Sequence, residues 1–481
     1  MISFIKQHAV VFVAVFIVVL LIAKFFYSLF VFDVPLGFDP GMYRYLFVKY
    51  AREFPPFSLP DLRPWAQEYP FGLFIITSYL IKAGIPMDWF LGWIWNLFPV
   101  ILLCTYAFIV YEKEGKSAGV LLLLIGFLSI AFYDGFAQMY WKTYLSLLFL
   151  IISFRFFEKE SLMMLPFAAL TILSHSQTGL ILGLTFAVWW LINLPLEWRN
   201  MQFRKWTAVF AFAALLGLVW YFPYWERAFW SPFKSVILLR GQSAPAGNFP
   251  SAFFFIKNGA VVFLLGAAGW LNSLVKDKKK ISVCLWQIAP AVCAVFIVFR
   301  LVFYNRFFLQ LDFFLMYFAA TYLKAVWRGR DYFLRAVLIV LVCVQGYLSV
   351  KQMLRWEPRF NKEELSEIAK IPEFVEKDAH IIALENNAAV WLLGWLPDYH
   401  TGGPGLFDFP AWTYPQWERF IYGSHDERLL LMRSIDVHPL YFMTSKLFFK
   451  HYGEFAQAFL SDPCFEKVEG SSLIKVVCRL Y

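Results

Sequence analysis

The sequence predicts a polytopic α-helical membrane protein with about eleven transmembrane helices, followed by a C-terminal extracytoplasmic α/β domain. Of the 481 residues, 60% are hydrophobic and only 16% are charged, whereas soluble proteins are about half apolar and about a quarter charged. The mean hydropathy is +0.58. The apolar residues gather in long runs before residue 350, and the remainder has a more ordinary composition. These properties exclude a disordered chain, a nucleic-acid-binding protein and an ordinary soluble enzyme.

The predicted spans are segments that approach the length of about 20 apolar residues needed to cross the hydrocarbon core. The first is too long for a signal-peptide core and lacks a small-residue cleavage site, so we expect it to be retained. Together they form a predicted transmembrane domain over residues 1–350. They lie at residues 8–31, 88–111, 117–133, 138–156, 162–174, 177–194, 206–224, 254–274, 281–303, 307–323 and 333–350.

The net charge of +9 is read as a topology signal, since Lys and Arg accumulate in cytoplasmic loops. Three basic clusters, at 199–205, 276–280 and 324–335, are separated by pairs of spans and therefore share one side. This parity places the N-terminus in the cytoplasm and residues 351–481 outside. We expect a multi-pass protein of a prokaryotic plasma membrane, surrounded by membrane lipids and with no nucleic-acid partner.

The first external loop is predicted at residues 32–87. Within it, Met42–Phe54 alternates apolar and charged residues in the pattern of a helix lying in the membrane interface. Residues 70–84 form a short apolar stretch, which we interpret as a helix inserted part-way from the outer side. A complete crossing there would reverse the predicted orientation of everything before it.

The extracytoplasmic domain, residues 351–481, mixes predicted helices and strands. An amphipathic helix is expected at 363–376, interrupted by Pro372, with strands at 379–384 and 439–443 and a helix at 446–460. Two further strands flank a Gly-Ser-Ser turn and form a terminal hairpin. Cys464 and Cys478 occupy opposite arms of this hairpin. They form either a disulfide, which the outer compartment permits, or two small residues of the core.

Ionisable residues recur at the ends of spans on the predicted outer face, where a cavity could gather them. They are Asp39, Asp134, His175, Glu226 and Arg306. Each also has a simpler interpretation. Asp39 could cap the helix that follows it, Asp134 could be a turn residue and His175 a hydrogen-bonded loop residue. Glu226 and Arg306 could be interface charges. The functional interpretation depends on their coincidence on one face.

Five short motifs resemble the GT-C superfamily of integral-membrane glycosyltransferases. Asp39, in Gly37-Phe38-Asp39-Pro40-Gly41, resembles the acidic residue that follows the first span in that family. Tyr69-Pro70-Phe71-Gly72 is similar to the family's Pro-containing helix start, with Phe71 in place of a second Pro. Asp134 resembles a second acidic residue in the next external loop. Residues 174–179, with His175 and Thr178, resemble a His-containing turn, and Arg306 stands where the family carries a basic residue.

The resemblance implies a GT-C-like fold and an enzyme that transfers sugar from a polyprenyl-phosphate donor, with inversion, at the outer face. It implies Asp39 as the catalytic base, with Asp134 as its rival. The donor phosphate would be bound by Arg306, with Lys142 and Arg44 as weaker candidates, and the substrates positioned by His175, Tyr304 and Glu226. The acceptor class, whether glycan, lipid or protein, stays open, as does a divalent metal, Mg²⁺ or Mn²⁺, bound by Asp39 and Asp134.

Two features separate the chain from the oligosaccharyltransferase branch, which typically has a two-acid cluster in the first loop and a Trp-Trp-Asp-like motif. Neither is present in the sequence. Three alternatives remain open. A lipid or glycan transporter would explain Asp312 and Lys257, which lie within predicted spans. An O-antigen polymerase or ligase would also use lipid-linked sugars, and a non-enzymatic envelope protein would use the external domain for binding.

Overall fold

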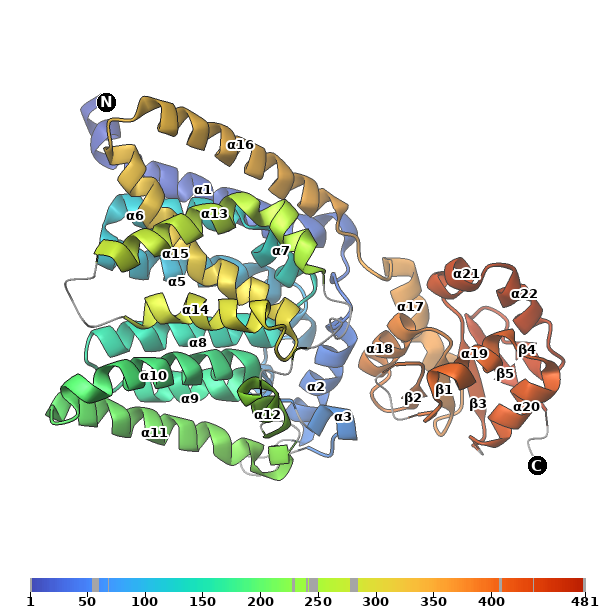
Figure 1. Ribbon diagram of the computed structural model, residues 1–481. Helices are drawn as coiled ribbons and strands as arrows, with labels where there is room; N and C mark the ends of the chain where they lie inside the picture. The colour runs from blue at the N-terminus through green and yellow to red at the C-terminus, as the bar shows by residue number, and fades with distance from the viewer. Residues whose placement is uncertain are drawn as a thin grey trace. The chain divides into compact units, whose positions relative to one another are not determined.

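The computed structural model describes residues 2–53, 60–67, 69–226, 230–238, 241, 250–276, 284–405, 409–435 and 437–478. The predicted basic residues Lys278, Lys279 and Lys280 lie outside these ranges. The chain divides into two compact units, which we call the helical unit and the mixed unit (Figure 1). The helical unit comprises Met1–Tyr27, Pro70–Leu73 and Trp93–Trp356, and the mixed unit comprises Ser28–Tyr69, Phe74–Gly92 and Glu357–Tyr481.

The helical unit is built from apolar helices packed side by side. Ten of the eleven predicted spans each overlap one of these helices, and the span predicted at 117–133 overlaps two, α6 and α7. Their bounds are α1 (Ile2–Phe32), α5 (Trp93–Glu114), α6 (Lys116–Leu128), α7 (Ile130–Ala137), α8 (Trp141–Glu158), α9 (Met164–Ser174), α10 (Ser176–Glu197), α11 (Met201–Tyr221), α12 (Ser231–Ile237), α13 (Ala252–Lys276), α14 (Leu285–Val298), α15 (Phe307–Arg328) and α16 (Tyr332–Arg355).

Not all of these helices meet the length and hydropathy expected of a complete span. Five described helices do, and the bent pair of α6 and α7 would make a sixth. Two of the predicted spans correspond to the short apolar helices α9 and α14. The helical membrane architecture is therefore present, but the count of about eleven complete crossings goes further than these helices alone support.

Aromatic side chains form much of the interior of the helical unit. The ring of Trp95 on α5 stacks on Phe136 of α7 at 5.5 Å and meets Trp141 of α8 at 4.9 Å. Phe132 of α7 packs against Tyr144 of α8 at 4.7 Å. Because lipid removes the hydrophobic drive between helices, close packing of large rings supplies contact area that holds the helices together. The many Phe residues therefore serve interhelical packing as well as exposure to lipid.

The segment predicted as one span at 117–133 is broken in the structure. α6 ends at Leu128 and α7 starts at Ile130, with a bend of 57° between them. All eight residues of α7 are buried. The prediction of an external loop at 134–137 is therefore wrong: Asp134 lies inside a buried helix, because the chain bends and continues as helix.

The mixed unit combines the first external segment with the C-terminal residues. The first segment contains α2 (Pro40–Glu53), α3 (Pro64–Gln67), most of α4 (Gly72–Lys82) and the 3₁₀ helix η1 (Met87–Phe90). α2 confirms the helix expected at Met42–Phe54. The α4 helix has 11 residues, too few for a complete span of about 20, in agreement with the short helix predicted at 70–84.

The C-terminal part of the mixed unit contains one five-stranded sheet with the order β2-β1-β3-β5-β4 (Figure 1). β1 pairs in parallel with both β2 and β3, whereas β5 is antiparallel to β3 and β4. The bounds of these elements are α17 (Lys362–Lys370), η6 (Ile371–Glu373), β1 (His380–Ala383), α18 (Asn386–Trp395), β2 (His400–Gly402), α19 (Tyr414–Tyr422), α20 (His425–Arg433), β3 (Leu440–Met443), α21 (Lys446–Tyr452), α22 (Glu454–Leu460), β4 (Phe465–Lys467) and β5 (Leu473–Val476).

The sheet confirms the strands expected at 379–384 and 439–443 and the terminal hairpin. Its core packs Phe442 of β3 and Ile474 of β5 against Phe420 and Phe459 of the covering helices. Cys464 and Cys478 form a disulfide, which resolves the two interpretations left open by the sequence. The expected helix at 446–460 is divided in two at Gly453, whose φ of 50° lies in the left-handed region that favours glycine.

Candidate active site

Asp134 anchors a polar group at the end of α7. Asp134 is only 2% exposed. The Gln138 side-chain amide donates a 2.7 Å hydrogen bond to Oδ2 of Asp134, and the Tyr140 hydroxyl donates a 2.6 Å bond to Oε1 of Gln138. Gln138 stands four residues after Asp134, the spacing that brings two side chains to one face of a helix. The carboxylate is thus oriented from its own helix.

His175 caps the start of α10. Its Nδ1 accepts a 3.3 Å bond from the backbone N–H of Thr178 and lies 2.9 Å from the Thr178 hydroxyl. Since Nδ1 accepts, the hydrogen-bond network assigns the ring proton to Nε2, which lies 3.3 Å from Thr143 Oγ1 on α8. His175 is 5% exposed. This geometry confirms a hydrogen-bonded residue in the turn between two helices and ties α8 to α10.

Two cationic side chains, Arg306 and Lys142, lie near His175. Both are close enough to act electrostatically on the His175 ring. The guanidinium of Arg306 also lies 5.8 Å from the centroid of the Tyr140 ring. Asp134 is thus connected to Arg306 through Gln138 and Tyr140, and the charges of Arg306 and Lys142 act on His175. We call Asp134, Lys142, His175 and Arg306 the polar group of the helical unit.

The loop before Arg306 has an unusual backbone. Arg300, Val302 and Phe303 all have positive φ, at 51°, 24° and 51°. Side chains other than glycine rarely adopt this region, and it is especially costly for the β-branched Val302. Such strain persists only where the surrounding structure enforces it, and it concentrates at functional sites. The strained segment leads directly into η5 (Tyr304–Arg306). Its backbone conformation therefore determines the position of Arg306.

Tyr304 and Glu226 have different environments in the helical unit. Tyr304 is buried at the start of η5, beside Asn305, whose amide donates a 2.9 Å bond to the Pro250 carbonyl. Glu226 is exposed after η2 (Phe222–Tyr224). Burial favours Tyr304 over Glu226 as a substrate-positioning residue. Sequence reasoning missed Gln138, Tyr140 and Thr143, although the four-residue spacing from Asp134 to Gln138 was a usable signal.

Asp39 belongs to the mixed unit and directly precedes α2. Its carbonyl accepts a 3.0 Å bond from Tyr43 N–H, so it occupies the N-cap position, with Pro40 at the first helical position. Both the capping interpretation and a chemical role are compatible with this place. Asp39 and Asp134 belong to separate units, and the metal site predicted from these two residues stays a prediction.

The residues that follow Asp39 join the first external segment to the C-terminal residues of the same unit. Arg44 donates to the Gly394 carbonyl at 2.8 Å and to Asp88 Oδ1 at 3.0 Å, and its guanidinium lies 5.0 Å from the Trp395 ring centroid. Arg63 donates to the Thr401 carbonyl at 2.7 Å. The guanidinium of Arg44 therefore links α2 to α18 through these contacts. Because its donors are already engaged, Arg44 is a weaker candidate for binding a phosphate.

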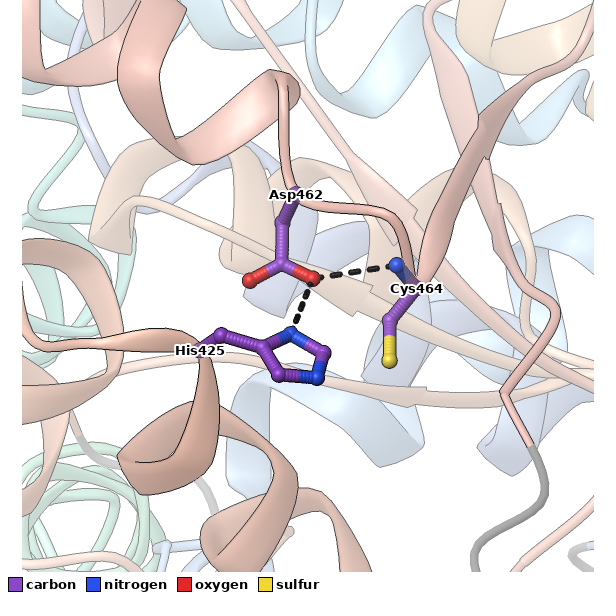
Figure 2. A group of neighbouring side chains, drawn as sticks. All are labelled: His425, Asp462 and Cys464. Carbon is purple, nitrogen blue, oxygen red and sulfur yellow. Dashed lines mark hydrogen bonds and ion pairs between the residues drawn. The ribbon is translucent and has the colours of Figure 1, made fainter.

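One group of metal-ligating residue types occurs among the described residues, at His425, Asp462 and Cys464 (Figure 2). Asp462 Oδ1 accepts from the backbone N–H of Cys464 at 3.0 Å and lies 2.9 Å from His425 Nδ1, while Arg428 donates to Oδ2 at 2.9 Å. The Cys464 sulfur is in the disulfide. Because both Asp462 oxygens and the sulfur are already bonded, this group does not fit a metal ion.

Sequence comparison identifies no relative: no family model matches the chain, and no curated protein matches it. Comparison with solved structures identifies proteins of similar fold. The apo oligosaccharyltransferase of Archaeoglobus fulgidus is 13% identical, with a TM-score of 0.64 over 91% of this chain and 70% of that chain. The chain has the GT-C fold.

Two further structures with the GT-C fold align with the chain. The A. fulgidus enzyme in complex with Zn and sulfate gives a TM-score of 0.57 at 13% identity, over 90% of this chain and 68% of that chain. ArnT from Cupriavidus metallidurans bound to undecaprenyl phosphate gives 0.55 at 13% identity, over 97% and 98%. The GT-C fold, together with the apolar helices, indicates a multi-pass membrane protein.

Proposed function

We propose that this protein is a glycosyltransferase that moves a sugar from a polyprenyl-phosphate donor to an acceptor at the outer face of a prokaryotic plasma membrane, with inversion at the anomeric carbon. The GT-C fold supports the reaction class. The undecaprenyl phosphate bound to ArnT supports a lipid-linked donor here. In this proposal the N-terminus is cytoplasmic and residues 351–481 are extracytoplasmic.

The observation that carries the proposal is the polar group formed by Asp134, Lys142, His175 and Arg306 within an apolar helical unit. Ionisable side chains are costly among membrane helices and are usually functional there. The group offers a carboxylate that can accept a proton and two cations that can bind a phosphate. A transfer that releases a polyprenyl phosphate requires these two chemical capacities.

The proposed reaction is a single displacement. An acceptor oxygen attacks the anomeric carbon, the bond from that carbon to the phosphate oxygen breaks, and the acceptor proton passes to a carboxylate. We assign that carboxylate to Asp39, with Asp134 as the alternative. The polyprenyl phosphate leaves with the electron pair of the broken bond, so its negative charge grows as the reaction proceeds.

Arg306 stabilises the leaving phosphate in this scheme, assisted by Lys142, since positioned cations lower the energy of developing negative charge. Arg44 is the weakest of the three cationic candidates because its guanidinium is engaged by Asp88 and Gly394. His175 and Tyr304 position the substrates, with the exposed Glu226 as a weaker candidate. A divalent cation held by Asp39 and Asp134 would add positive charge at the phosphate when bound.

The proposal is tested with purified protein in lipid nanodiscs, undecaprenyl phosphate and a panel of undecaprenyl-phosphate-linked sugars. Arg306→Gln removes a charge-assisted contact worth about 1.5 to 3 kcal/mol, so its affinity for undecaprenyl phosphate should fall about tenfold or more. The exposed Arg330→Gln, which lies outside the polar group and the strained segment, is the matched control and should bind as the wild type does. Equal affinity in all three proteins would assign Arg306 to headgroup anchoring instead.

A further inference from the structure

The break between α6 and α7 is surrounded by side chains from other helices. Lys24 of α1 donates to the Phe127 carbonyl at 2.6 Å and lies 3.5 Å from the Ser129 carbonyl. Gln345 of α16 donates to the Leu128 carbonyl at 3.2 Å. A helix end leaves its last carbonyls without partners inside the helix, and here side chains of α1 and α16 supply them.

Ser129, which follows the break, fixes the first turn of α7. Ser129 Oγ accepts a 2.9 Å bond from the Phe132 N–H, which makes Ser129 the N-cap of α7. The same hydroxyl donates a 2.5 Å bond to Asp312 Oδ2 on α15. Ser349 of α16 completes the group, since it accepts from Lys24 at 2.7 Å and donates to the Phe127 carbonyl at 2.9 Å.

We call these five residues (Lys24, Ser129, Asp312, Gln345 and Ser349) the break network. Its two charged members are buried, with Lys24 3% and Asp312 0% exposed. Charges buried among membrane helices are costly, even when neighbouring groups compensate them. Gly126 in the last turn of α6 and the N-cap Ser129 allow a bend locally. The side chains contributed by distant parts of the sequence bond the backbone groups that the bend leaves open.

We propose that the break network fixes the direction of α7 and thereby positions the Asp134 carboxylate, so that its members are positioning residues for the proposed sugar transfer. α7 has only eight residues, and Asp134 is the fifth residue after Ser129. A short helix held at its first turn moves as one body, so a change at Ser129 displaces Asp134. The functional part of this inference rests on the proposed function; the structural part does not.

The transporter alternative would explain Asp312, which lies within a predicted span. In the structure, Asp312 is enclosed and hydrogen bonded to the residue that caps α7. Lys24 is directed to backbone carbonyls and to the Ser349 hydroxyl. These contacts give both side chains a role in stabilising the bend, while Oδ1 of Asp312 is buried with no hydrogen-bond partner among the described residues.

The first measurement is amide hydrogen exchange of peptides covering residues 126–137 in the full-length protein in nanodiscs. Ser129→Ala removes the cap and the contact with Asp312, whereas Ser129→Thr retains a hydroxyl for both. We expect faster exchange in Ser129→Ala and near wild-type exchange in Ser129→Thr. If Ser129→Ala does not fold, Gln345→Leu takes its place in the measurement, because it removes only hydrogen bonds to backbone carbonyls. Ser153→Ala is the matched control, because this buried hydroxyl has no hydrogen-bond partner among the described residues.

The second measurement is sugar transfer by the same variants, with undecaprenyl phosphate affinity measured separately. Ser129→Ala should lower kcat by about tenfold to about a hundredfold without changing that affinity, because a displaced Asp134 no longer serves as the alternative base or as a ligand of the proposed cation. Unchanged exchange in both Ser129→Ala and Gln345→Leu overturns the network. Altered exchange with wild-type kcat overturns its link to Asp134. If wild-type protein transfers no sugar, the proposed function fails, and the exchange measurement still decides the structural part.

Discussion

Gly41 and Gly394 bring the backbones of α2 and α18 into direct contact. A Cβ atom added to Gly41 would lie 2.0 Å from the Val390 carbonyl oxygen, and one added to Gly394 would lie 2.5 Å from the Gly41 carbonyl oxygen. Side chains at either position would force the two helices apart. Because Gly41 is two residues from Asp39, this contact links the place of Asp39 to the C-terminal residues of its unit.

Gly394→Ala should destabilise the mixed unit by about 1 to 3 kcal/mol, the usual cost of forcing extra atoms into a packed interior. Its thermal midpoint, followed by tryptophan fluorescence, should fall. Gly183→Ala in α10 is the control, since no atom outside its own helix lies within 4 Å of an added Cβ there, and alanine is the better helix former. A Gly394→Ala midpoint equal to that of Gly183→Ala would show that α2 and α18 do not pack as described.

The disulfide between Cys464 and Cys478 should stabilise the terminal hairpin. The two cysteines are 14 residues apart, and closing a loop of this size contributes about 3 kcal/mol through the unfolded chain. Reduction, or Cys464→Ser with Cys478→Ser, should therefore lower the thermal midpoint of the mixed unit. Cys343→Ser changes an exposed, unpaired cysteine and should have no such effect. Equal midpoints with and without reductant would contradict a stabilising disulfide.

Asp462 should make the mixed unit sensitive to acid. Burial raises the pKa of Asp462, but hydrogen bonds from Cys464 N–H, Arg428 and His425 outweigh it and hold the pKa below its usual value. A carboxyl whose pKa is lowered on folding contributes stability above its unfolded pKa of about 3.9, and this is lost as the pH falls through the folded value. Asp462→Asn should destabilise the protein at pH 7, and its deficit should shrink as the pH falls below about 3.9. A deficit that stays constant as the pH falls would argue against the charged contact.

Local patterns in the sequence were sufficient to find most elements. Long apolar runs placed the helices, and Pro372 correctly ended the amphipathic helix, now α17. His175 between two apolar runs was correctly placed in a turn. These features depend on nearby residues, so a single sequence reveals them. β2 was missed because its three residues, His400–Gly402, carry no alternating pattern.

Features that depend on distant partners were not predictable in this way. The break after Leu128 has only weak local signals, Gly126 and the N-cap Ser129, and its carbonyls are bonded by Lys24 and Gln345 from helices far away in the sequence. The loop prediction for Asp134 failed for the same reason. Arg44 was predicted as a weaker phosphate-binding candidate, whereas its partners in the structure, Asp88 and Gly394, come from two separate segments. Tertiary hydrogen bonds, rather than propensities, decide these positions.

The central claim is tested most directly by sugar transfer from undecaprenyl-phosphate-linked donors by wild-type protein and Asp39→Asn. Asparagine keeps the size of the side chain but cannot accept the acceptor proton, so turnover should be lost while undecaprenyl phosphate still binds. Asp33→Asn, which changes an exposed acid of the same segment that pairs with Lys362, should transfer sugar normally. Wild-type turnover by Asp39→Asn, or no transfer by the wild-type protein from any donor, would contradict the account.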